Sequence, residues 1–581
     1  MTFCDRRAIP PAPRSLFCRA FSRTASSILI FVVLLVVLEL IPGRPLIAQV
    51  KASLGQRAQF EGDLEIINLD YKDHVSILYF LKLQDGSHMP LRFLSHPPTH
   101  LQSGAHVRAD GELSNGSLVL YSGNTSLATT TTSTSTVSTS ASPVSGTLGP
   151  QSTLVILVNF QDSPVQPYSV ADAKNAYFGT ANSFFSENSY GQTTLTGDVV
   201  GWFKIPESIL TCNMSSIATD AQTAAKASGV NLANYTRYVY AFPTNNACGW
   251  AGSSNVGGNP SQSWINGNTL DIHTIVHELG HAFGLWHSHL MDCGTSATIG
   301  TNCSIVDYGD PLDVMGVPQS SSAHYNAFQK ERLGWLNYGN SPSIQTVQSS
   351  GTYTIDSYEL GGTGPNALKI LKSVDSTTGA KTWYYVEARK AVGFDAFLAD
   401  GVYYTQNETN GVLFHVGTDG NGNSGDLLDM TPTTSTSSGW LDASLAVGQS
   451  FQDPAAGVTF TTTQVSSTGA TIQVAINGSS VTPSLKVSTN QSSYNLGQTV
   501  GITVTAFNGS TPAAGVSVSV NLIAPNGQAS SLKGTTGSNG SATLSYKLSR
   551  RSPIGTYQVQ AATKGTGSNP TIGASTSFVV Q

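Results

Sequence analysis

The chain has 581 residues, and at about 100 to 200 residues per domain this length predicts three or four domains. Charged residues make up 11% of the sequence, against about 25% in typical soluble domains, and small polar residues are abundant, which is typical of β-rich extracellular modules. The net charge of -6 is small for this length and no basic stripe is present, so we expect no nucleic acid among the partners.

The N-terminal segment combines a basic stretch with an apolar one. Residues 28–38 form an uninterrupted apolar run, which ends before Pro42-Gly43 and follows five arginines: Arg6, Arg7, Arg14, Arg19 and Arg23. This order predicts a signal peptide over residues 1–48, cut near Ala48, because the run is shorter than the roughly 20 residues of a spanning helix. We therefore expect a secreted, extracellular protein; the alternative is an N-terminal membrane anchor.

Residues 49–123 alternate in hydrophobicity like strands, with turn signals at Asp85-Gly86 and Asn115-Gly116, and this pattern predicts a small β-barrel or sandwich. Residues 124–149 contain no charged residue and almost no large apolar side chain, so they are expected to be a flexible Ser/Thr-rich linker. A folded module ahead of such a linker indicates a pro-segment that is removed by cleavage; a permanent accessory binding module is the alternative. Because residues 49–211 contain no cysteine, a thiol from this segment cannot block a metal.

Residues 150–342 are expected to form an α+β domain, because strand and helix patterns alternate there. The apolar run 152–160 predicts a strand buried on both faces, and Ser169 can cap a helix that follows it. A second helix is expected within 215–228 and a further strand at 237–243.

Beyond residue 342 the helical patterns disappear. Short strand patterns separated by glycine-rich turns predict a β-sandwich over residues 343–479 and an immunoglobulin-like β-sandwich over residues 480–581. These domains are expected to act as spacers or to contact cell wall, matrix or glycan, and we expect the protein to be a monomer.

Four cysteines remain once Cys4 and Cys18 leave with the signal peptide. An even number in an exported chain predicts two disulfides, and the simplest pairing of three joins Cys212 to Cys248 and Cys293 to Cys303. A zinc–thiolate site is the alternative, but no CxxC spacing supports it.

The strongest signal for chemistry is the string HELGHAFGLWH at residues 277–287. Residues four apart project from the same face of a helix, so His277 and His281 can aim their imidazoles at one point, with Glu278 beside them. Asn268 is a suitable N-cap for this helix. Gly284 can adopt a left-handed conformation and turn the chain back, so that His287 becomes a third ligand.

Three neutral imidazoles around Zn²⁺ leave one position open for a water molecule, which distinguishes a catalytic site from a closed structural one. Glu278 is then expected to take the proton of this metal-bound water and to return it to the leaving amine.

At these residues the chain resembles the metzincin metallopeptidases, and more narrowly the gametolysin family. The resemblance rests on His277, Glu278, His281, Gly284 and His287, and on YGDPLDVMG at 308–316, which looks like that family's Met-turn with Met315 as its methionine. Further similar stretches lie at 158–162, 189–203 and 327–336.

The resemblance implies a twisted sheet, an active-site helix and a hydrophobic floor under the zinc ligands. It also implies that an extended protein or peptide substrate pairs with a sheet edge, for which residues 248–256 and 263–267 are the candidates. Some metzincins place a tyrosine two residues after the Met-turn methionine; Val317 stands there in this chain, and Tyr308 is too weak a candidate to be assigned that role.

Weaker signals have simple alternatives. His273 and His289 could be ligands or partners of ligands, but partly exposed helical histidines are the preferred interpretation. Residues 419–426 resemble a Ca²⁺ loop but lack a closing glutamate, so a glycine and asparagine turn is preferred there.

The sequence thus predicts a secreted zinc endopeptidase that hydrolyses peptide bonds in extracellular proteins. The alternative is a catalytically vestigial cell-surface or matrix-binding protein, although the intact motif argues against loss of catalysis.

Overall fold

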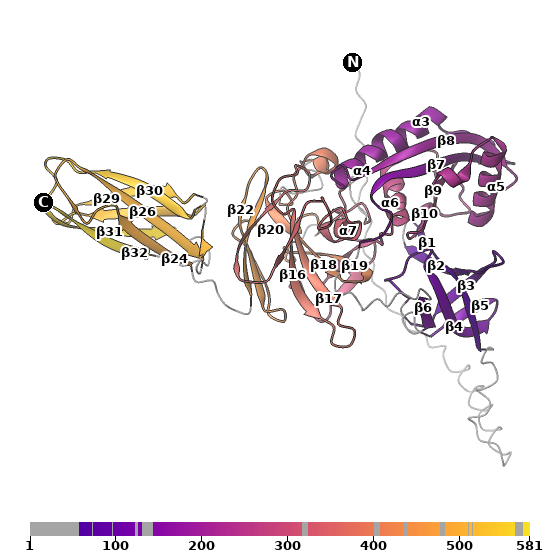
Figure 1. Cartoon of the computed structure of the whole chain (residues 1–581), viewed down its shortest axis with the longest axis horizontal. Helices are drawn as coiled ribbons and strands as arrows, with labels where there is room; N and C mark the ends of the chain where they lie inside the picture. Colours follow the sequence, from indigo (N-terminus) through magenta and orange to yellow (C-terminus); the bar gives the residue numbers. More distant parts are fainter. Residues whose placement is uncertain are drawn as a thin grey trace, which may run out of the picture. The chain divides into compact units, whose positions relative to one another are not determined.

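The computed structural model describes residues 57–581 apart from 72–73, 96, 122–125, 130–142, 317–322, 400–406, 435–439, 477–482, 509–510, 514, 538 and 564–572. The predicted signal peptide, residues 1–48, lies outside the described residues. Within the described part of the chain, no helix combines the length and the apolar character that crossing a membrane requires. The protein is a β-rich chain of several sheets with few helices (Figure 1).

The N-terminal module consists of five strands that close on themselves and a short sixth strand. They are β1 (Arg57–Tyr71), β2 (Val75–Lys82), β3 (His88–Phe93), β4 (His106–Ser114), β5 (Ser117–Leu120) and β6 (Leu127–Thr129). Hydrogen bonds join β1 to β2, β2 to β3, β3 to β5, β5 to β4 and β4 back to β1. The two turns expected from the sequence lie between β2 and β3 and between β4 and β5, with Gly86 and Gly116 at φ values of 82° and 76°.

The next sheet carries the mixed helix and strand part of the chain. Its strands are β7 (Gly149–Phe160), β8 (Thr193–Ile205), β9 (Arg237–Phe242), β10 (Trp250–Asn255) and β11 (Ser261–Asn266). The order is β1-β10-β11-β9-β7-β8, so the long strand β1 belongs both to the barrel and to this sheet. Strand β7 is buried on both faces, as its apolar sequence predicts: Val155 and Leu157 face one core, and Leu154 and Ile156 face the other.

Helices cover both faces of this sheet. They are α3 (Val170–Asn175), the π-helical η2 (Ala176–Ala181), α4 (Asn182–Asn188), α5 (Met214–Ala227), the 3-10 turn η3 (Leu232–Asn234) and α6 (Ile272–Ala282). A further helix, α7 (Ala327–Arg332), packs against the sheet that follows in sequence. The segment from α3 to α4 packs with α6 on one face, and α5 packs on the other. Ser169 caps α3 through a capping box, as predicted. Helix α6 begins after Asp271 and not after Asn268, because the Asp271 carboxylate accepts the N–H of Thr274.

A β-sandwich follows, and it includes strands from both sides of residue 342. One sheet contains β12 (Ser288–Asp292), β13 (Ser304–Val306), β14 (Ile344–Val347), β16 (Ala367–Val374), β17 (Lys381–Glu387), β18 (Gly411–Thr418), β19 (Asn421–Leu428) and β20 (Leu445–Ala446). The other contains β15 (Gly351–Asp356), β21 (Ser450–Asp453), β22 (Val458–Val465) and β23 (Gly469–Ile476), and the 3-10 segment η4 (Gly393–Ala399) lies between β17 and β18. Strand β12 precedes residue 342 and pairs with β19, which follows it. One sheet of the sandwich therefore contains strands from both sides of the domain boundary expected at residue 342.

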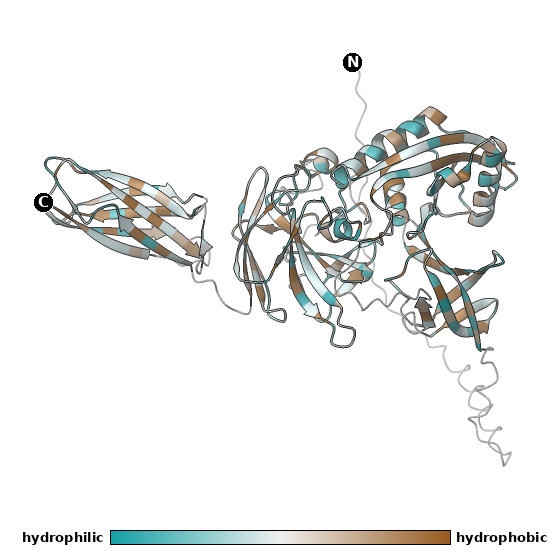
Figure 2. Ribbon diagram, in the orientation of Figure 1, coloured by the Kyte–Doolittle hydropathy of each residue, from teal (hydrophilic) through white to brown (hydrophobic). Residues whose placement is uncertain are grey.

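The C-terminal domain is built of two sheets that share one core. The first contains β24 (Pro483–Thr489), β26 (Thr499–Asn508), β27 (Thr511–Pro512) and β30 (Ser541–Lys547). The second contains β25 (Ser493–Tyr494), β28 (Ser517–Ile523), β29 (Ala529–Thr535), β31 (Gly555–Thr563) and β32 (Gly573–Val580). Hydrophobic and hydrophilic residues alternate along these strands, as Figure 2 shows, because one face of each sheet is buried.

Both predicted disulfides are present: Cys212 is bonded to Cys248, and Cys293 to Cys303. The first joins the segment before α5 to the segment before β10. The second closes the segment between β12 and β13.

The structure bears on two further expectations. The segment 419–426 consists of the turn between β18 and β19 and the first six residues of β19, and its side chains have other partners: Asn423 binds His289, and Asp419 lies 3.6 Å from Lys369. This hairpin gives no support to the Ca²⁺ interpretation. The expected linker 124–149 is also shorter, because β6 pairs with β4 and the Val144 N–H donates to the Arg332 carbonyl.

Candidate metal centre

Helix α6 carries the first three residues of the predicted site. His277, Glu278 and His281 are each about 1% exposed, because the helix packs between β10, β11 and the loop 308–316. The apolar side chains of Ile275, Val276 and Leu279 enter the core beside the sheet. The helix therefore holds its two histidines at one buried end of the sheet.

Gly284 ends the helix and turns the chain back. Its φ is 100°, and the N–H groups of Gly284 and Leu285 donate to the carbonyls of His281 and Gly280, the two bonds of a Schellman motif. After this turn the Nε2 atom of His287 lies 3.2 Å from the Nε2 atom of His281. The structure thus brings together the three histidines that the sequence singled out.

The opposite nitrogen of each imidazole faces an oxygen. His277 Nδ1 lies 2.7 Å from the Val314 carbonyl, His281 Nδ1 lies 2.9 Å from the Leu285 carbonyl, and His287 Nδ1 lies 3.4 Å from a carboxylate oxygen of Asp307. When Nδ1–H donates to such an acceptor, Nε2 is unprotonated and keeps its lone pair. The Nε2 lone pairs of the three histidines then converge on one point. Asp307 was not identified from the sequence.

The loop 308–316 forms the floor below the histidines. Met315 is fully buried against Gly280, and its carbonyl accepts the N–H of Ser288. The Asp313 carboxylate accepts the N–H groups of Met315 at 2.7 Å and of Asn326 at 2.7 Å. Because both partners are backbone groups, the loop is tied directly to the segment that leads into α7.

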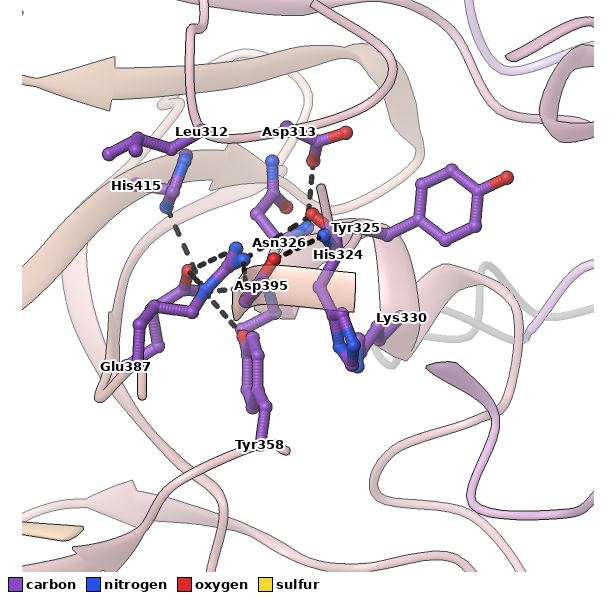
Figure 3. A network of polar contacts seen from close by, with 12 residues as sticks. Leu312, Asp313, His324, Tyr325, Asn326, Lys330, Tyr358, Glu387, Asp395 and His415 are labelled. Atoms are coloured by element: carbon purple, nitrogen blue, oxygen red, sulfur yellow. Dashed lines mark hydrogen bonds and ion pairs between the residues drawn. The ribbon is translucent and has the colours of Figure 1, made fainter. Parts of the chain in front are cut away.

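A buried polar network extends this anchoring into the following β-sandwich (Figure 3). Glu387 on β17 accepts the N–H of Ala327 at 2.8 Å and pairs with Arg389, which also contacts Asp395 at 2.8 Å. His415 on β18 lies 2.9 Å from Asp310 of the floor loop. The sandwich therefore supports the metal centre as well as following it in sequence.

A fourth side chain reaches the histidines from the N-terminal module, and sequence reasoning missed it. The Asp70 carboxylate at the end of β1 lies 2.9 Å from His287 Nε2, 3.4 Å from His277 Nε2 and 3.5 Å from His281 Nε2. The four ligand atoms all lie within 4.8 Å of one another. The sequence around Asp70 matches no metal motif; its one signal is that Asn68 and Asp70 alternate with apolar residues in a strand.

The electrostatics favour a positive charge at this point. Burial opposes ionisation of Asp70, but the charge of His287 and the closeness of the three imidazoles outweigh it and hold the pKa of Asp70 well below its usual range. Burial lowers the pKa of His277 to about 4. At His287 the effect of burial is outweighed by Asp70 and Asp307, which raise the pKa of His287 to about 9.

Glu278 lies next to these residues but forms no hydrogen bond through Oε2. Burial and the adjacent Asp70 carboxylate raise the pKa of Glu278 well above its usual range. A Cβ at Gly252 of β10 would lie only 2.0 Å from Glu278 Oε1, so the glycine makes room for this carboxyl group.

Of the two neighbouring histidines, His273 agrees with its expectation and His289 does not. His289 is not a helical, partly exposed residue: it lies on β12, is 2% exposed, and contacts Asn423 and Asp307. His273 does lie on α6, half-buried, with its ring 5.5 Å from that of His277. The Tyr308 ring packs 4.6 Å from the ring of His287, while Val317 falls outside the described residues.

The donor set fits a dication that prefers nitrogen ligands. His277 Nε2 and Asp70 Oδ2 are buried and have no hydrogen-bond partner, which is costly unless another group satisfies them. Among the residues that the structure describes, no other group of three or more His, Cys, Asp or Glu side chains converges in this way.

Comparison with known proteins identifies the region that contains this site. The gametolysin peptidase M11 family matches residues 163–407. The chain contains a gametolysin-family peptidase catalytic region. This peptidase region includes the three histidines, Glu278 and Met315, and it extends past residue 342 into the β-sandwich. The match to this family supports the interpretation of the region as a metallopeptidase.

Asp70 lies outside the residues that the family matches. No curated protein matches the chain. Solved structures match with low scores: a DUF4785 family protein from Legionella pneumophila is 19% identical with a TM-score of 0.15, and covers 21% of this chain and 35% of that one. A tetra-tandem repeat of a large adhesion protein is 16% identical with a TM-score of 0.18, and covers 40% and 50% of the two chains. The sporulation control protein Spo0M from Bacillus subtilis is 13% identical with a TM-score of 0.13, and covers 17% and 49%. The chain thus spans half or less of the length of these three structures.

Proposed function

We propose that the protein is a secreted zinc endopeptidase that hydrolyses peptide bonds in extracellular proteins. The observation that carries this proposal is the convergence of three imidazole Nε2 atoms beside the buried Glu278 carboxyl group within a gametolysin-family region. Three neutral nitrogen ligands with room for one more group are the donor set of a catalytic zinc site.

The nitrogen ligands favour zinc over calcium and magnesium. Calcium and magnesium prefer oxygen donors, whereas imidazole suits zinc. Zinc–nitrogen bonds of about 2.0 to 2.1 Å place tetrahedral ligand atoms about 3.3 to 3.4 Å apart. The separation of 3.2 Å between the Nε2 atoms of His281 and His287 agrees with this spacing.

In this proposal three histidines bind the metal and Glu278 transfers the proton. His277, His281 and His287 hold the ion, and the oxygens facing their Nδ1 atoms orient the rings. When bound, zinc supplies a Lewis acid for the scissile carbonyl and acidifies a water molecule at the open position. Glu278 takes the proton of the attacking water and passes it to the leaving amine.

The substrate is proposed to pair as an extended strand with β10. This strand lies at the edge of the five strands β7 to β11, and its residue Gly252 lies directly against Glu278. Backbone pairing with a sheet edge recognises an extended segment largely independently of its side chains. It therefore favours unfolded or extended stretches of protein as substrates.

Secretion is supported by the disulfides and by the N-terminal sequence. Disulfides persist in oxidising, extracellular surroundings, and both pairs join segments close to the proposed active site. The basic and apolar order of residues 1–48 is that of a secretory signal.

The test compares the Glu278→Gln variant with the parent. In both chains a TEV protease site is placed within residues 130–142 and is cut before the assay, because the N-terminal module is expected to be a pro-segment. We expect both to hold one zinc ion per chain by elemental analysis, and the variant to cleave casein roughly 10²- to 10⁴-fold more slowly. Glu207→Gln, which changes a carboxyl group remote from the histidines, is the matched control and should retain activity. Equal casein cleavage by Glu278→Gln would disprove the assigned role. Zinc binding without cleavage by the cut parent would favour the vestigial binding protein.

A further inference from the structure

We propose that Asp70 is a fourth protein ligand of the metal and that the N-terminal module, residues 57–129, keeps the peptidase latent until the chain is cut. This inference rests on the proposed function, because it concerns the regulation of that same site. It adds to the pro-segment interpretation of the N-terminal module the residue and the contacts that would keep the site closed, which neither the sequence nor the family match supplies.

The first argument is the position of the Asp70 carboxylate. Its contacts of 2.9, 3.4 and 3.5 Å to the three Nε2 atoms are close to the spacing of about 3.3 Å between ligands of one tetrahedral zinc ion. A carboxylate placed there takes the position that a reacting water molecule needs. The site is then closed by four protein ligands, like a structural zinc site.

The second argument is that the carboxylate is oriented by its own strand. Residues two apart project from the same face of a strand, so Asn68 and Asp70 both face the histidines. The Asn68 side-chain amide donates to Asp70 Oδ1 at 2.5 Å, and the Asn68 carbonyl accepts the hydroxyl of Ser253. Both Asn68 and Asp70 are buried, so the carboxylate is held in place before any ion binds.

The third argument is that β1 covers the proposed substrate edge. Residues Ile67 to Tyr71 pair antiparallel with β10, and Asp70 is the direct partner of Gly252. The backbone groups of β10 that a substrate would use are therefore already bonded. The module blocks both requirements of the reaction: the fourth metal position and the pairing edge.

Apolar contacts hold the module in this position. Ile67 and Leu69 belong to the same core as Trp250 and Trp264 of the peptidase region. In return Trp286, the residue before His287, is buried in the core of the barrel. Strand β1 of the module thus packs in the core of the peptidase region, and the residue next to His287 packs in the core of the module.

A cut within residues 130–142 would release the module. These residues contain no charge and consist almost wholly of Ser, Thr and Ala, a composition suited to proteolysis. The chain beyond them makes its own contacts with the peptidase region, such as that of Val144 with Arg332. Cleavage ends the high effective concentration of a tethered inhibitor, so the module can then dissociate.

The test uses the uncut full chain, loaded with zinc, in a Glu278→Gln background that prevents self-cleavage. Acetohydroxamic acid, which binds zinc through two oxygens, serves as the probe, and its binding is measured by thermal shift. We expect Asp70→Ala to bind it at least about tenfold more tightly than the Asp70 chain does, with one zinc retained in both. Asp70→Asn keeps the shape of the strand but not the charge, and its probe affinity should also exceed that of the Asp70 chain.

Asp63→Ala is the matched control, since Asp63 is an exposed carboxylate on the same strand. In this variant the probe should remain excluded. Equal probe binding by Asp70→Ala, Asp70→Asn and the Asp70 chain would overturn the proposal.

A second measurement, with Glu278 intact, separates the two hypotheses. We expect the parent and Asp70→Ala to leave casein intact while uncut, because β1 still covers β10 in both, and to cleave it after cleavage at the TEV site. If the uncut parent already cleaves casein as fast as the cut parent, the latency proposal fails and the peptidase proposal stands. If the cut, zinc-loaded parent is inactive, the peptidase proposal fails, and the probe measurement still decides the role of Asp70.

Discussion

Gly280 lies directly above the sulfur of Met315: a Cβ added to Gly280 would be 2.5 Å from Met315 Sδ and 2.9 Å from the hydroxyl of Tyr325. A glycine within a helix normally costs about 0.5 to 1 kcal/mol relative to alanine. Here the close approach of the floor explains its presence, because the helix that carries His277 and His281 can lie this near to Met315 only without a side chain at position 280.

Substitution Gly280→Ala should therefore destabilise the peptidase region by about 1 to 3 kcal/mol, although alanine favours helix. The measurement is chemical unfolding followed by tryptophan fluorescence, since five of the seven tryptophans lie between residues 202 and 335. In a Met315→Ala background the added methyl group has space, so the same substitution should cost less. Additive effects of the two substitutions would show that this contact does not limit the packing.

The motif and its immediate supports could be predicted from the sequence because they are local. Helical periodicity places His277 beside His281, and a glycine at position 284 allows the turn that returns His287. The same reasoning paired neighbouring cysteines correctly. Asp70 could not be predicted, because its approach depends on the pairing of β1 with β10, about 180 residues later in the chain.

The strand pairing across residue 342 and the burial of His289 could not be predicted for a related reason. Strand β12 follows the third histidine directly, yet it hydrogen-bonds to β19, so a segment of the peptidase region completes the next sheet. Strand pairing over such separations leaves no periodic signal in either segment. His289 is consequently buried on a strand, and its neighbours Asn423 and Asp307 come from both sides of that junction.

Gly284→Ala should weaken metal binding as well as stability. A side chain at a φ of 100° is strained by about 1 to 2 kcal/mol, and a Cβ there would lie 2.3 Å from Gln102 Nε2. Relief of this strain moves the turn that places His287, so the zinc affinity, measured by competition with a chelator, should fall. Gly294→Ala is the control, because Gly294 has a φ of 78° and open space around its Cα. Unchanged zinc affinity in Gly284→Ala would contradict this account of the turn.

Asp426 on β19 predicts a pH dependence of stability. Burial raises its pKa from 3.8 to about 6, against the opposing charges of His289 and His415. The folded state therefore binds more protons than the unfolded state between these values, and this residue lowers stability as the pH rises through that window. Asp426→Asn stays neutral, so its stability relative to the parent should increase from pH 4 to pH 7 by up to about 3 kcal/mol.

Unfolding midpoints of both proteins at pH 4, 5, 6 and 7 provide the measurement. Glu207→Gln serves as the control, because its carboxyl group is not enclosed in a core. If the stabilities of Asp426→Asn and the parent differ by the same amount at all four pH values, Asp426 does not titrate as its burial requires.

The two disulfides should differ in their contribution to stability according to the loops that they close. The Cys212–Cys248 bond closes a loop with a sequence separation of 36, and Cys293–Cys303 one of 10. Loop-closure entropy then gives about 4 kcal/mol for the first and about 3 kcal/mol for the second. Unfolding of the two double alanine variants under oxidising conditions measures this difference.

Their functional consequences should also differ, because they constrain different sides of the metal centre. Cys248 lies two residues before β10, so loss of its bond should loosen the edge with which a substrate pairs and raise KM for peptide substrates. Cys293 lies just beyond β12, whose pairing with β19 holds the segment after His287, so loss of that bond should mainly speed zinc loss to a chelator. The opposite assignment, with faster zinc loss and raised KM exchanged between the variants, would mean that β10 is not the edge that receives the substrate.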